Sequence, residues 1–130
     1  MSLGEVNVLF GWCWMCMGFI FGLILGMRAE GENWLGGYGS LKRRYLRLGH
    51  VAFIALSMIN ILYGKEIVTS VLPASIARAG SILMIFGAVG IPLTCITAVF
   101  FRKAKFFLPL PALAMLIGTA AMAINMIMQL

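Results

Sequence analysis

The sequence predicts an all-α integral membrane protein, with four transmembrane helices in a small bundle and both termini outside (N-out/C-out). Hydrophobic residues make up 62% of the 130 residues and charged residues only 11%, whereas an ordinary globular domain has about a quarter charged residues. A chain of this length leaves much of its surface exposed, so it could not hide that much apolar material from water. Four apolar runs also approach the ~20 residues that a membrane-spanning helix needs.

The same composition excludes other classes of protein. A disordered chain lacks this density of Leu, Ile, Phe and Met. The chain has 4 acidic residues, all of them Glu, and 1 His, which leaves little material for acid–base catalysis. We therefore expect no catalytic activity of its own.

The apolar runs define one domain that covers residues 1–130. We place the spans at about residues 8–27, 45–64, 76–101 and 106–129. Helices are favoured over barrel strands because the runs show no alternation of polar and apolar residues. Pro73 precedes the third span, and Pro109 and Pro111 stand in the first turns of the fourth, where a helix tolerates proline.

The basic residues predict the orientation of the spans. Most of the 10 Lys and Arg residues lie in the first and third loops: Arg28, Lys42, Arg43, Arg44, Arg47, Arg102, Lys103 and Lys105. Only Lys65 and Arg78 flank the second loop. The positive-inside rule therefore places the first and third loops in the cytoplasm and both termini outside, and we expect a bacterial inner membrane. No nucleic-acid motif accompanies these residues, so we expect them to meet lipid headgroups and not nucleic acid.

Glycines mark one face of the first span. Gly11, Gly18, Gly22 and Gly26 share a helical face because their spacings are four or seven residues. Glycine lets two helix backbones approach closely, which is a main source of attraction between helices in lipid. The sequence predicts a packing face here, against another span of this chain or against another protein.

The second span carries a polar stripe. Arg43, Arg47 and His50 follow at spacings of four and three, and Ser57 and Asn60 continue the same side. Polar groups are costly in hydrocarbon, so this side should face protein or a cofactor. One interpretation is hydrogen bonding between helices.

The other interpretation is a cofactor site at the inner interface, formed by His50, Arg47, Arg43 and Ser57. The imidazole of His50 would ligate the iron of a b-type haem while the arginines pair with its propionates. Alternatively His50 would donate a hydrogen bond to a quinone. The sequence leaves the cofactor unknown.

The chain resembles three known families in part. Small multidrug-resistance transporters resemble the chain in length and span number, but they depend on a glutamate in the first helix, which residues 8–27 lack. The run from Gly36 to Tyr45 is similar to the opening motif of dual-topology fluoride channels, although it lies here in a loop. Both families tend towards balanced loop charge, unlike this chain. Single-histidine membrane anchors of respiratory dehydrogenases are similar in size and in their one histidine.

We therefore expect a small accessory or anchor subunit of a larger membrane complex, of a respiratory or electron-transport kind. Its partners would be membrane lipid and other membrane subunits. The alternative is a stand-alone oligomeric channel or carrier for an ion or small molecule, in which the polar stripe of the second span lines the path.

Overall fold

A computed structural model describes residues 1–130 as four helices without strands. The helices are α1 (Leu3–Arg28), α2 (Leu41–Glu66), α3 (Ala74–Phe100) and α4 (Pro109–Met128). Short 3₁₀ segments connect them: η1 (Trp34–Gly36), η2 (Ile67–Thr69) and η3 (Arg102–Phe107). All four helical segments are long and apolar enough to cross a membrane. The all-helical class and the number of candidate spans are thereby confirmed, and helices of this length and composition suggest a membrane protein.

Local caps explain why the first two helices start before the predicted spans. The Ser2 hydroxyl accepts from the Glu5 backbone N–H at 3.3 Å, and the Glu5 carboxylate accepts from the Ser2 N–H at 2.6 Å. This reciprocal arrangement satisfies two N–H groups that a helix start leaves unpaired. Ser40 caps α2 in the simpler way, by accepting from the Arg43 N–H at 3.2 Å. The spans were placed by hydropathy alone and so omitted these polar first turns.

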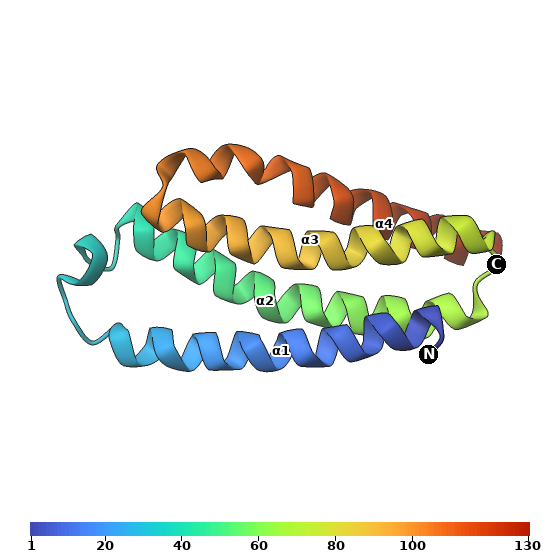
Figure 1. Cartoon of the computed structure of the whole chain (residues 1–130), viewed down its shortest axis with the longest axis horizontal. Coiled ribbons are helices and arrows are strands. Elements are labelled where there is room, and N and C mark those ends of the chain that lie inside the picture. The colour runs from blue at the N-terminus through green and yellow to red at the C-terminus, as the bar shows by residue number, and fades with distance from the viewer.

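The helices follow one another in antiparallel order (Figure 1), with both chain termini at one end and the first and third connections at the other. α2 packs between α1 and α3, and α4 packs on α3. α1 and α4 therefore form the two outer edges. α1 also reaches α3, where the indole N–H of Trp14 donates to the carbonyl of Ala88 at 2.9 Å. This order gathers most of the basic residues at the same end of the molecule. Those predicted for the first loop lie instead at the end of α1 and in the first turns of α2, and the connection between these helices carries Glu30 and Glu32.

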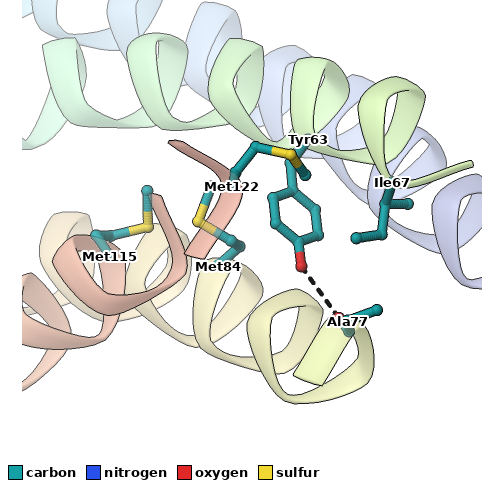
Figure 2. Packing of buried hydrophobic residues seen from close by; sticks show 6 residues of the cluster. All are labelled: Tyr63, Ile67, Ala77, Met84, Met115 and Met122. Atoms are coloured by element: carbon teal, nitrogen blue, oxygen red, sulfur yellow. Dashed lines mark hydrogen bonds between the residues drawn. The ribbon is translucent and has the colours of Figure 1, made fainter. Parts of the chain in front are cut away.

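Long side chains fill the space between α2, α3 and α4 (Figure 2). The hydroxyl of Tyr63 on α2 donates to the carbonyl of Ala77 on α3 at 3.0 Å. Two glycines make room for this core. A Cβ at Gly80 would collide with the Tyr63 hydroxyl, and one at Gly118 would lie 2.7 Å from the sulfur of Met84. Glycine facing a bulky side chain is what brings these helices into close contact.

The second connection is tied to the end of α4. The side-chain oxygen of Asn125 accepts from the Ser70 hydroxyl at 2.9 Å and from the Val71 N–H at 3.0 Å. The amide of Gln129 donates to the carbonyl of Thr69 at 2.8 Å. These bonds satisfy backbone groups that the turn between α2 and α3 leaves free, and they hold α4 in place at its C-terminal end.

Candidate functional site

Arg43 holds the connection between α1 and α2. Its side chain is only 6% exposed. The guanidinium donates to the carbonyl of Trp34 at 2.7 Å and to that of Gly31, and it lies 5.2 Å from the centre of the Trp34 ring. The connection needs such support because Leu35, a residue with a side chain, has a left-handed backbone with φ of 52°. Arg43 therefore supplies the donors that hold this turn.

Arg47 performs a similar role one turn further along α2. Its guanidinium donates to the carbonyl of Tyr38 at 3.2 Å and lies 4.4 Å from the centre of that ring. A cation over an aromatic face is attracted by the ring's negative face. Both arginines of the predicted site are thus engaged with the connection.

His50 turns towards α1. Its imidazole packs on Gly22, where an added Cβ would lie 2.9 Å from Nε2. The ring of Phe21 is 6.4 Å away, centre to centre. His50 Nδ1 is the one buried side-chain nitrogen or oxygen without a hydrogen-bond partner. A buried polar atom without a partner is uncommon and calls for an explanation. Because Nδ1 is enclosed, Nε2 is the nitrogen that could face a ligand.

Ser57 lies deeper and makes a local contact. Its side chain is fully buried, and its hydroxyl donates to the carbonyl of Phe53 in the same helix. The four residues of the predicted cofactor site thus have different neighbours: two contact the connection, one packs on Gly22 and one bonds within α2. None of them lines any of the five main cavities.

Of the four glycines that the sequence predicted to form a packing face of α1, three lie against α2. An added Cβ at Gly11 would lie 2.8 Å from the carbonyl oxygen of Ser57, and one at Gly18 would lie 2.9 Å from Cβ of Phe53. Gly22 faces His50, as described above. Gly26 has no atom of another residue within 4 Å of its Cβ position. The glycine face of α1 is therefore used inside this chain over most of its length.

The glycine contact extends further than the sequence indicated. Gly4 on α1 and Gly64 on α2 meet near the chain termini, where a Cβ at Gly64 would lie 2.8 Å from a methyl group of Val8 and closer still to the Gly4 carbonyl. Gly4 stands seven residues before Gly11, so the same helical spacing could have revealed it.

A buried polar cluster that sequence reasoning missed joins three helices. The amide of Asn7 on α1 donates to the side-chain oxygen of Asn60 on α2 at 3.0 Å, and the hydroxyl of Ser81 on α3 donates to Asn7. Asn60 in turn donates to the carbonyl of Met84 at 3.2 Å. Asn7 was placed outside the first span, although its spacing of four from Gly11 puts it on the glycine face. Nothing in the sequence singled out Ser81.

No group of three or more His, Cys, Asp and Glu side chains is close enough to hold a metal ion. Cys13 and Cys16 are exposed on α1, and Cys95 is buried in α3. The chain matches no known protein family, and no curated protein or solved structure is similar to it.

Proposed function

We propose that this chain is a membrane-embedded accessory or anchor subunit of a larger complex. The observation that carries the proposal is that polar side chains are bonded inside the bundle while apolar helix faces remain exposed. Four polar side chains of α2 make hydrogen bonds within the chain, namely Arg43, Arg47, Ser57 and Asn60. The apolar faces of the two edge helices stay uncovered. Such faces are stable only against lipid or against another protein.

The buried polar side chains of α2 favour a structural role for this chain over a role in transport. Asn60 and Ser57 would line the path in a channel built on the α2 stripe. Both are fully buried, and their polar atoms are occupied by bonds to Asn7, Met84 and Phe53. Bonds between helices in a membrane are individually modest, but a closed cluster across three helices favours a single arrangement of α1, α2 and α3.

The edges offer large contact surfaces. On α1, Phe19 is 59% and Leu23 66% exposed; on α4, Leu116 is 62% and Ile127 68% exposed. We assign these two faces to lipid and to neighbouring subunits.

For orientation, we propose that the basic end of the bundle faces the cytoplasm of a bacterial inner membrane and that both termini lie outside. Single cysteines at Leu130→Cys and Lys103→Cys, each in a background without native cysteines, would test this with a membrane-impermeant thiol reagent. In intact cells we expect labelling of the first variant and none of the second until the membrane is opened. The reverse pattern would contradict the orientation.

His50 is the residue that we propose for an electron-transfer role within the complex, as a contact to a quinone or a ligand to haem iron. The support for this proposal is that neither ring nitrogen is committed to a hydrogen bond within the chain: Nδ1 is buried without a partner, and Nε2 is the nitrogen that a quinone or haem iron could reach. His50→Gln preserves hydrogen bonding but removes a good iron ligand. A haem role predicts loss of the Soret band in this variant. A quinone role predicts no such band in the parent protein and lower quinol-linked activity after His50→Ala. Normal spectra and activity in both variants would leave His50 a packing residue.

The subunit proposal is tested by the composition of the native particle. After extraction in mild detergent, native mass spectrometry should find this chain in a fixed stoichiometry with other membrane proteins. A homo-oligomer that conducts ions or a small molecule in liposomes would instead support the channel or carrier. A monomer with neither property would contradict both.

A further inference from the structure

The basic residues at one end of the bundle fall into two groups. Arg43 and Arg47 are held by carbonyls of the first connection. Lys42 and Arg102 instead line a cleft between the start of α2 and the end of α3, and both side chains are exposed. In Figure 1 these two helix ends lie at the end of the molecule opposite the chain termini.

The cleft combines charge with apolar walls. Its volume is about 430 Å³. Lys42 and Arg102 supply the charge, Tyr45 adds a hydroxyl, and the remaining lining is apolar, including Val99 and Phe100. No acidic residue lines the cleft, so nothing within it neutralises the two cations.

The electrostatics of α2 point the same way. The amino-terminal end of a helix carries partial positive charge, which favours acidic residues in the first turn. The first turn of α2 has no acidic residue and instead holds Lys42, Arg43 and Arg44. The segment that follows α3 adds Arg102, Lys103 and Lys105. These cations repel one another and the partial charge of the helix end, and a bound anion would relieve that repulsion.

We propose that the cleft binds one anionic phospholipid. Lys42 and Arg102 hold the phosphate, and an acyl chain lies along the apolar walls. Basic pockets between membrane helices on the cytoplasmic side suit this kind of ligand. A lipid accounts for both halves of the cleft, whereas a water-soluble phosphate would use only the cations. The inference rests on the proposed membrane location but not on partner subunits.

Native mass spectrometry of the purified full chain would test the site. The probes are phosphatidylglycerol and phosphatidylcholine with the same acyl chains. We expect one phosphatidylglycerol to bind per chain in preference to phosphatidylcholine. The double variant Lys42→Gln with Arg102→Gln should lose roughly thirtyfold in affinity, from about a factor of five for each cation.

Two further double variants test whether any loss of binding comes from the cleft itself. Lys103→Gln with Lys105→Gln removes the same charge from the same end but outside the cleft lining, and it should bind almost as well as the parent. Lys42→Arg with Arg102→Lys keeps the charge and should retain binding, which separates a lost site from a misfolded chain.

Three results would overturn the inference: equal binding of phosphatidylcholine, equal losses in the two Gln double variants, or displacement of the lipid by glycerol 3-phosphate. The last would indicate a soluble phosphate as the ligand. If the chain is found in an intact heteromeric complex but binds no phosphatidylglycerol, this inference alone is contradicted. If the chain does not insert into membranes, the proposed function is contradicted as well.

Discussion

Gly11→Ala tests whether backbone contact between α1 and α2 holds the molecule together. The new Cβ would lie 2.5 Å from a side-chain carbon of Ile61 and 2.8 Å from the carbonyl oxygen of Ser57. Ordinary contacts begin at 3.4 Å. Because the Ser57 oxygen belongs to the backbone of α2, it cannot rotate away, and the two helices must separate locally by about 0.6 Å.

The separation has two costs. Inserting a methyl group into a packed contact destabilises a protein by about 1–3 kcal/mol. The Asn7–Asn60 hydrogen bond, at 3.0 Å one turn away, would also stretch, and such bonds contribute on average about 0.6 kcal/mol in a membrane protein. Alanine offsets up to about 1 kcal/mol of this through its higher helix propensity.

Gly26→Ala is the matched control. It makes the same chemical change on the same helix, but no atom of another residue lies within 4 Å of the new Cβ. The gain in helix propensity is then common to both variants. We expect Gly11→Ala to be less stable than Gly26→Ala by about 1.5–3.5 kcal/mol.

The free energy of unfolding would be measured by titrating mixed micelles with sodium dodecyl sulfate, with far-ultraviolet circular dichroism as the signal. Equal stability of the two variants, within about 0.5 kcal/mol, would refute the reasoning. It would show that α1 can move away from α2 without loss.

Three other substitutions have expected outcomes. Arg43→Lys should raise amide hydrogen exchange in the α1–α2 connection about tenfold, since hydrogen bonds to charged groups contribute about 1.5–3 kcal/mol; Arg44→Lys, at an exposed neighbouring position, should leave it unchanged. Asn60→Leu should lower the free energy of unfolding by about 1–2 kcal/mol, because it removes the centre of the buried polar cluster, and a neutral result in the same titration would show that the cluster adds nothing. Gly22→Leu should displace the imidazole of His50 and reduce recovery of intact assembly in native gels, and full recovery would show that this contact is dispensable.

Features that act over a few residues could be recognised in the sequence. The hydropathy of each run predicts four helices because the length of an apolar run sets whether it can cross a bilayer. Pro109 and Pro111 were expected in the first turns of the fourth helix, where proline costs no helical hydrogen bond, and α4 begins at Pro109. Helical spacing also placed the glycines of α1 on one face.

The partners of these faces could not be predicted in the same way. His50 and the two arginines share one side of α2, which suggested a common site, but their long side chains reach α1 and the connection instead. Spacing along a helix predicts on which face each Cβ atom lies, but not which residues the end of a long side chain contacts. The relative rotation and depth of the helices decide that, and hydropathy contains no information on either.

The sequence by itself determined the helical class, the four apolar segments and the concentration of positive charge near the first and third connections, because each depends on the composition of a short stretch of chain. Only the tertiary structure decided that Asn7, Asn60 and Ser81 meet, that glycines of α1 face α2, and that Lys42 and Arg102 share a cleft. The physical reason is that helices in lipid gain little from hydrophobic burial against one another. Their arrangement therefore depends on close backbone contacts and individual hydrogen bonds between residues far apart in the chain.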